Sequence, residues 1–174
     1  VPEGWRVTDV YTVVDVVYGA PYRSDLFNDR GEGRPLIRIR DLSTHNPATF
    51  TPEQHPRGYL VRPGDLVVGM DGEFRAHMWT GPNSWLNQRL CCFKPKDGSP
   101  QSFVRFSIEQ PLAFFERSKT GTTVVHLGKA DIDTFKVLLP PGQVLQEFGK
   151  IGDPLEQRVV VCAQQSATLA ALRD

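Results

Sequence analysis

Three consecutive polar residues, Asn87, Gln88 and Arg89, carry the side chains of this sequence that are best suited to reading another molecule. The forked ends of asparagine, glutamine and arginine pair with two atoms at once on the edges of adenine and guanine. No catalytic motif lies beside them. The triplet therefore indicates recognition, although a structural interpretation, in which Asn87 bonds to the backbone of a turn, stays open.

Arginine supplies most of the positive charge, with 14 arginines against 6 lysines. A cluster of them, which includes Arg38 and Arg40, lies between Tyr22 and Leu42. Arginine makes planar, two-pronged contacts with bases and phosphates, whereas lysine acts as a point charge. A strand over residues 36–40 would place Arg38 and Arg40 on one exposed face. The alternative is that these arginines pair with the acidic residues interspersed among them.

Three further loops offer polar groups for the same purpose. The turn 70–75 has glycines that let backbone N–H groups approach a ligand closely. The loop 19–28 and the turn before Gly121 add hydroxyl and cationic side chains. The candidate contacts in these loops are Tyr22, Arg23, Ser24, Gly72, Glu73, Arg75, Lys119 and Thr120.

A rival interpretation makes the chain a small β-rich enzyme that uses His126 with Asp131 or Asp133 as an acid–base pair. Asp131, however, lies where a short helix over 129–135 needs a capping residue. The other histidines have no metal-ligand spacing relative to one another or to the cysteines. Cys91, Cys92 and Cys162 form no disulfide framework, and Cys91 and Cys92 are expected to behave as small buried hydrophobes.

The elements that would position these residues are short strands separated by glycine, proline, asparagine and aspartate. We predict strands over residues 13–18, 36–40, 59–61, 66–69, 89–93 and 123–127. A helix over 103–117 is predicted to break or kink at Pro111. The expected fold class is α+β, with a β-rich body over residues 1–141.

The C-terminal residues 142–174 have a helical pattern instead. Asp153 is a suitable N-cap, and Pro154 fits the first helical position. Apolar residues then recur at spacings of four or three, interrupted only by Ser166, as in a coiled coil. We call these residues the seam: Leu155, Val159, Cys162, Leu169 and Leu172. The seam predicts a partner helix, and packing on the chain's own body is the alternative.

The composition of the 174 residues is that of one globular domain, with 40% hydrophobic and 23% charged residues. A formal net charge of zero gives no basic excess for nonspecific phosphate binding. We find no transmembrane run and no signal peptide, and the cysteine usage suits a reducing cytoplasm. The absence of an initiator methionine leads us to expect a piece of a longer protein.

An ordered set of motifs resembles the target recognition domain of a type I restriction-modification specificity subunit. The motifs are GAPYRSDLFN, GRPLIRIRDL, GDLVVGMDGEF, W…LNQR, GTTVVHL and LPP. The ending QEFGKIGDPLEQRV…LAALRD resembles the conserved helical region that follows such a domain. The likeness covers nearly the whole chain and corresponds to half of a subunit.

This resemblance implies that the chain reads one half of a split site in double-stranded DNA. It implies a helix that docks DNA methyltransferase subunits and assembly with a restriction and translocase subunit, and it leaves open a homodimer formed through that helix. Catalysis, S-adenosylmethionine, ATP and Mg would belong to the partner subunits, so that this chain is no enzyme and binds no cofactor. A protein-interaction module that binds only through its C-terminal helix is a third interpretation.

Overall fold

The computed structural model describes residues 1–96, 98–118 and 126–173. Its first sheet is antiparallel and has the strand order β2-β9-β6-β7. The strands are β2 (Val14–Tyr18), β6 (Leu66–Gly69), β7 (Ala76–Met78) and β9 (Leu90–Pro95). The predicted strands 13–18, 66–69 and 89–93 are therefore confirmed to within two residues at their ends.

The second sheet has the order β4-β3-β8-β5 and contains a parallel pair, β3 with β8. Its strands are β3 (Arg34–Ile37), β4 (Phe50–Thr51), β5 (Leu60–Val61) and β8 (Ser84–Leu86). The predicted strand 59–61 corresponds to β5. Most of the predicted strand 123–127 lies outside the described residues.

The first sheet is covered by apolar side chains on both faces. Along β9, Cys91 and Phe93 enter one buried cluster, and Leu90 and Cys92 enter another, as strand alternation requires. Burial raises the pKa of both thiols, because the charged thiolate is poorly solvated there. The interpretation of Cys91 and Cys92 as small buried hydrophobes is thereby confirmed.

In the described residues, three helices and a ribbon accompany the two sheets. Helix α1 (Gln101–Ser118) packs against the first sheet, and the short helix α2 (Lys129–Ile132) follows it in the chain. A two-stranded ribbon pairs β1 (Arg6–Asp9) with β10 (Lys136–Leu139), directly before α3 (Gly142–Arg173). Three single 3-10 turns are η1 (Val10–Thr12), η2 (Ser24–Leu26) and η3 (Ile39–Asp41). The prediction for Pro111 is a break or a kink, and the break is wrong because α1 continues through this residue.

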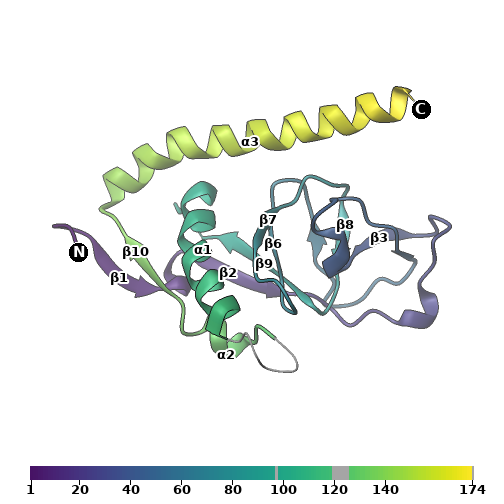
Figure 1. Cartoon of the computed structure of the whole chain (residues 1–174), viewed down its shortest axis with the longest axis horizontal. Helices are drawn as coiled ribbons and strands as arrows, with labels where there is room; N and C mark the ends of the chain where they lie inside the picture. Colours follow the sequence, from purple (N-terminus) through teal and green to yellow (C-terminus); the bar gives the residue numbers. More distant parts are fainter. Residues whose placement is uncertain (97, 119–125, 174) are drawn as a thin grey trace.

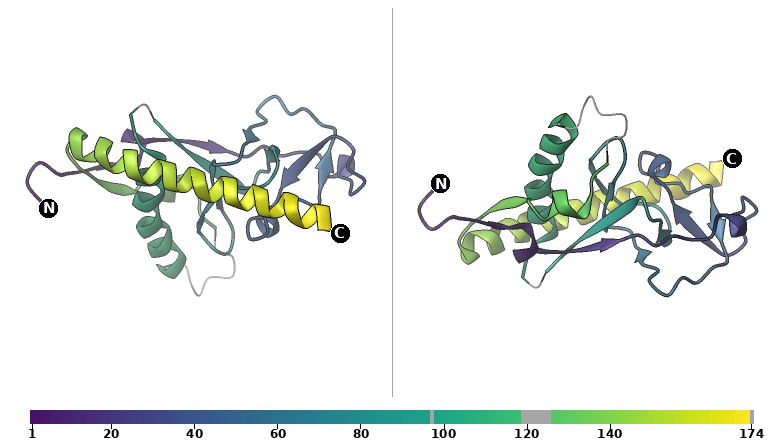
Figure 2. Two further views of the ribbon diagram at one scale, coloured as in Figure 1. Left: turned by 90° about the horizontal axis from the view of Figure 1, so that it is seen from above. Right: turned by 90° about the horizontal axis from the view of Figure 1, so that it is seen from below.

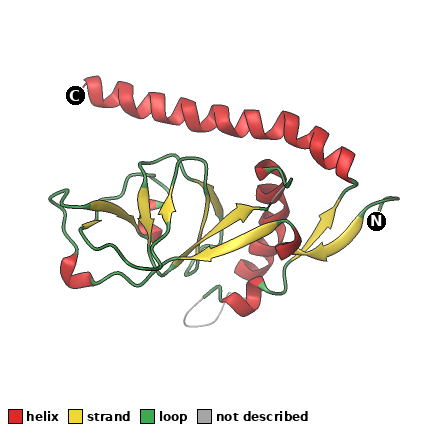
Figure 3. Cartoon of the chain, turned by 180° about the vertical axis from the view of Figure 1, so that it is seen from behind, coloured by secondary structure: helices red, strands yellow, loops and turns green. Residues whose placement is uncertain are grey.

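Helix α3 lies along one side of the molecule, from α1 to the second sheet (Figures 1 and 2). Figure 3 shows α1 and α2 between the ribbon and the sheets, with the second sheet at the opposite end from the ribbon. The 32 residues of α3 make a helix about 48 Å long. The mixed α+β class and the C-terminal helix are confirmed. None of the helices in the described residues has the length and apolar character needed to cross a membrane.

The predicted start of the C-terminal helix at Asp153 is wrong, since α3 begins at Gly142 and contains Pro154. Asp153 caps a different helix. Its Oδ1 accepts hydrogen bonds from the backbone N and the Oγ of Ser102, at 2.9 and 2.7 Å, in the first turn of α1. Asp153 therefore caps the first turn of α1 and not the start of its own helix.

Two glycines let α3 approach α1 closely. A Cβ at Gly149 would lie 2.5 Å from Cγ of Pro100, and one at Gly152 would lie 2.3 Å from Oγ of Ser102. Contacts this short do not occur between real side chains, so only glycine fits at both positions. The sequence pattern of this segment thus encodes a helix–helix contact.

Candidate nucleic-acid interface

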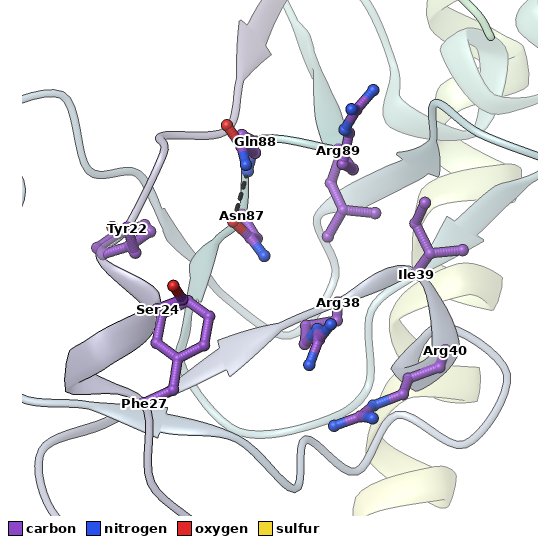
Figure 4. Close-up of a pocket in the computed structure, with 10 residues that line it drawn as sticks. Tyr22, Ser24, Phe27, Arg38, Ile39, Arg40, Asn87, Gln88 and Arg89 are labelled. Atoms are coloured by element: carbon purple, nitrogen blue, oxygen red, sulfur yellow. Dashed lines mark hydrogen bonds between the residues drawn. The ribbon is translucent and has the colours of Figure 1, made fainter.

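Most of the predicted recognition residues meet in one recess of about 420 Å³, where the two sheets join (Figure 4). Three separate segments supply its walls: the loop around η2, the residues after β3, and the turn between β8 and β9. We call it the arginine recess. Its lining residues are Tyr22, Ser24, Phe27, Arg38, Ile39, Arg40, Asn87, Gln88, Arg89 and Leu90.

The triplet 87–89 forms a tight turn, which connects the second sheet to the first. The N–H of Leu90 donates to the carbonyl of Asn87 at 3.0 Å, and Oδ1 of Asn87 accepts the N–H of Gln88 at 2.8 Å. A Cβ at Gly19 would lie 1.9 Å from the Asn87 carbonyl oxygen, so glycine is required there. These contacts support the structural interpretation of Asn87. The side chains of Gln88 and Arg89 are exposed.

The predicted strand over 36–40 is too long, because β3 ends at Ile37 and η3 follows. The buried carboxylate of Asp41 accepts the N–H of Arg38 at 2.9 Å, and the N–H of Asp41 donates to the Arg38 carbonyl at 2.9 Å. This closed turn replaces the strand. Arg38 and Arg40 still line the same recess, for a reason other than strand alternation.

The arginines of the cluster differ in how strongly they are engaged. Arg23 pairs with Asp25 at 2.6 Å and lowers the pKa of that carboxyl group, and Arg30 pairs with Glu32 at 2.9 Å. Arg40 donates to Oγ1 of Thr49 at 3.1 Å. Arg23 and Arg30 therefore pair with nearby acidic residues, as the alternative interpretation expects.

Arg38 is different, because its guanidinium group has no ion-pair or hydrogen-bond partner among the described residues. It is exposed and lines the recess. Among the arginines that line the recess, Arg38 is therefore the one whose donors are most available to a ligand.

Tyr22 does not present its hydroxyl group to the solvent. Its side chain is only 6% exposed and stacks on Trp85 at 6.1 Å between ring centroids. The buried hydroxyl group has no hydrogen-bond partner in the described part of the chain. The prediction that Tyr22 touches sugar or phosphate is not supported, and the ring supports the recess from within.

The turn after β6 is only partly joined to the arginine recess. Arg75 pairs with Glu73 at 3.5 Å and lines another recess of about 380 Å³ beside α1. Gly72 has a φ of 81°, in the left-handed region that glycine favours. Asp71 of the same turn reaches Arg89 at 3.4 Å. Lys119 and Thr120 lie outside the described residues.

The apolar wall of the recess, Phe27 and Ile39, was not anticipated as part of a site. Both residues also contact buried clusters. Their sequence pattern is that of ordinary core residues, so no local signal distinguishes them.

The predicted acid–base residues make hydrogen bonds within the fold. Nδ1 of His126 lies 2.6 Å from Oδ1 of Asp71. Asp131 accepts the N–H of Gly128 at 2.8 Å, as expected of a residue that caps a helix, and Asp133 accepts hydrogen bonds from Lys129 and Tyr11. These contacts give the enzyme interpretation no support. No group of three potential metal ligands gathers within the described ranges.

The seam faces away from the body. Leu155, Val159, Leu169 and Leu172 are between 57% and 78% exposed, and Cys162 is exposed as well. Another face of α3 packs on the body through Leu145, Gly149, Glu156 and Val160. The helix thus contacts its own body and leaves the seam uncovered.

Comparison with known proteins identifies a matching family and a curated relative. Residues 2–167 match the family described as type I restriction modification DNA specificity domain. The specificity subunit of the type I restriction enzyme EcoBI from Escherichia coli is 33% identical over 173 residues, which are 99% of this chain and 35% of that protein. The chain therefore spans about a third of the length of this curated relative.

Solved structures share the fold. The HsdS subunit from Thermoanaerobacter tengcongensis superposes with a TM-score of 0.62 at 19% identity, over 95% of this chain and 40% of that one. The type I restriction-modification S subunit from M. genitalium gives 0.62 at 13% identity, over 97% and 41%. On the strength of the matched residues 2–167, the chain belongs to the type I restriction-modification DNA specificity domain family.

Proposed function

We propose that this chain recognises a specific sequence in double-stranded DNA, as one recognition domain of a type I specificity subunit. The observation that carries the proposal is the convergence of Arg38, Arg40, Gln88 and Arg89 from separate segments on one exposed recess. Arginine and glutamine are the side chains that read guanine and adenine edges in the major groove.

The neutral net charge of the chain supports recognition of DNA through a small number of specific side-chain contacts. A protein without a basic excess gains little affinity from counterion release, so the arginines of the recess would carry much of the binding. Residues 1–141 would form the recognition domain, and 142–174 the spacer and docking region. The chain itself would catalyse no reaction and would act in the cytoplasm.

The seam would dock partner subunits, namely the DNA methyltransferase and, through it, the restriction and translocase subunit. S-adenosylmethionine, ATP and Mg would be bound by those partners. A second copy docked through the same helix would create a symmetric reader of two half-sites, and the mass of the chain in solution would reveal such a dimer.

The first experiment is affinity capture from the source cells with this chain as bait, followed by mass spectrometry. We expect an S-adenosylmethionine-dependent DNA methyltransferase among the captured proteins. Methylation of a randomised duplex library by the captured complex, read by sequencing, then identifies the target. A captured complex that methylates all duplexes alike would contradict sequence recognition.

Alanine variants test the recess on that target duplex. Replacing Arg89 should weaken binding by about 1–3 kcal/mol and relax the preference at one base pair. If Arg38 contacts phosphate, its replacement should weaken all duplexes alike and reduce the salt dependence. The matched control is Arg6→Ala in β1, outside the recess. Unchanged affinity for the variants at Arg38, Arg40 and Arg89 would show that DNA binds elsewhere.

A further inference from the structure

Three segments far apart in the sequence meet behind the exposed face of Arg89. Nη1 of Arg89 lies 3.4 Å from Oδ2 of Asp71, and Oδ1 of the same carboxylate lies 2.6 Å from Nδ1 of His126. The backbones are joined as well. The N–H of Met70 donates to the Arg89 carbonyl at 2.9 Å, and the N–H of Leu127 donates to the Met70 carbonyl at 2.7 Å. The contacts form a continuous chain from Arg89 to His126.

The side chain of Asp71 is 29% exposed and lies between two more exposed ones, Arg89 at 58% and His126 at 42%. An exposed arginine on a turn has several rotatable bonds, and ordering them on binding costs conformational entropy. A partly buried carboxylate, itself held by an imidazole N–H, restricts the guanidinium group before any ligand arrives. Restriction of this kind improves affinity because less freedom is lost on binding.

The geometry also leaves Arg89 able to bind. The shortest contact between Arg89 and Asp71 is at Nη1, and neither Nη2 nor Nε donates a hydrogen bond to a described residue. Two neighbouring guanidinium donors are what a two-pronged contact with the O6 and N7 atoms of guanine requires. Asp71, in contrast, uses one oxygen for Arg89 and the other for His126. Both of its oxygens therefore face a protein neighbour.

We propose that Asp71 and His126 are positioning residues, which orient Arg89 for a two-pronged contact with one base pair. The inference rests on the proposed DNA recognition. It extends that proposal by assigning specificity at this base pair to three linked residues, Arg89, Asp71 and His126. Asp71 and His126 touch no DNA in this arrangement. Their replacement should act only through Arg89.

The test measures affinity for the target duplex and for its variants at the base pair read by Arg89. The Arg89→Ala change should cost about 5- to 150-fold in affinity for the target. Asp71→Asn should relax discrimination at the same base pair and at no other. In an Arg89→Ala background the same change should have an effect below about twofold, because the residue through which it acts is gone.

Variants at His126 supply a conservative rescue. His126→Asn retains an N–H donor near the position of Nδ1 and should retain most of the discrimination, whereas His126→Ala should lose it. Asp15→Asn is the matched control. It is the same substitution in an ion pair of the same length, 3.4 Å to Lys96, on β2. Circular dichroism and thermal unfolding confirm that each variant is folded.

The outcomes separate the two proposals. If Arg89→Ala weakens binding while Asp71→Asn and His126→Ala do not, the positioning role is wrong and DNA recognition stands. If Asp71→Asn weakens all duplexes equally, or equally in the Arg89→Ala background, Asp71 acts on the fold or on DNA directly, and the inference again fails. If Arg89→Ala itself has no effect, the proposed recognition site is wrong.

Discussion

Glu156 in α3 is a carboxylate with an incomplete set of partners. It is 7% exposed, and its Oε1 accepts a hydrogen bond from Nη1 of Arg105 at 3.1 Å, across the contact between α1 and α3. Its Oε2 is buried with no partner in the described structure. Burial raises the pKa of Glu156 more than Arg105 lowers it, and the carboxylates of Asp153 and Glu109 raise it further. The folded chain therefore holds this proton more tightly than a solvated glutamate would.

This environment predicts a pH-dependent effect of Glu156→Gln. Because the folded pKa exceeds the ordinary value of about 4.3, the folded state binds this proton more tightly than the unfolded state. The contribution of Glu156 to the free energy of unfolding is thus most favourable below that value and is lost as pH rises through the folded pKa. Glutamine does not titrate, so the variant should gain stability relative to the wild type at pH 8 and not at pH 4.

Urea unfolding at the two pH values measures this difference. The control is Glu147→Gln, which removes the same charge from an exposed pair with Lys150 on the same helix. A difference between Glu156→Gln and wild type that does not change with pH would show that Glu156 is not protonated preferentially in the folded chain.

The close contact between α1 and α3 requires glycine, which has no side chain, and Gly152→Ala tests this requirement. Alanine favours a helix by about 1 kcal/mol over glycine. Here the added methyl group would also lie 2.7 Å from Cβ of Ser102, which is buried and bound to Asp153. We expect the overlap to dominate and to lower the free energy of unfolding by roughly 1–3 kcal/mol.

The comparison is with Gly142→Ala, in the first turn of the same helix, where a Cβ meets no atom within 4 Å. Denaturant titration followed by circular dichroism measures both variants. Equal or increased stability of Gly152→Ala would mean that the helices separate at little cost.

At the scale of elements, the sequence predicts those helices and strands that are determined by residues close together in the chain. Alternating or wholly apolar segments located β2, β5, β6 and β9, since a strand has a period of two. The start of α3 could not be found this way, because Asp153 finds its partner Ser102 51 residues away. The end of β3 was likewise decided by Asp41, whose carboxylate closes a turn that alternation does not reveal.

The candidate site shows the same limit. Side-chain chemistry identified Arg38, Arg40 and Arg89, and the structure brings them to one recess. The sequence alone could not show that Tyr22 lies buried against Trp85, or that the Asn87 carbonyl lies against Gly19. These contacts depend on how the two sheets join.

The whole molecule leaves the seam uncovered, and Val159→Lys tests its proposed role in docking. Val159 is 57% exposed, so lysine there should leave the thermal unfolding of the chain unchanged. A charge in the apolar interface should strongly reduce capture of the methyltransferase. Val161→Lys is the matched control, since Val161 lies off the seam on the same helix and is 39% exposed. Equal capture by both variants would place the docking surface elsewhere.

The pairing of β1 with β10 determines how the molecule would carry a mechanical load. Arg6, where β1 begins, pairs with Leu139, where β10 ends shortly before α3. Tension between the residues before β1 and helix α3 would therefore open the ribbon like a zipper, from Arg6 toward the pair of Asp9 with Lys136. The pair of Asp9 with Lys136 would part last, so along this path force reaches the first sheet only after the ribbon has opened.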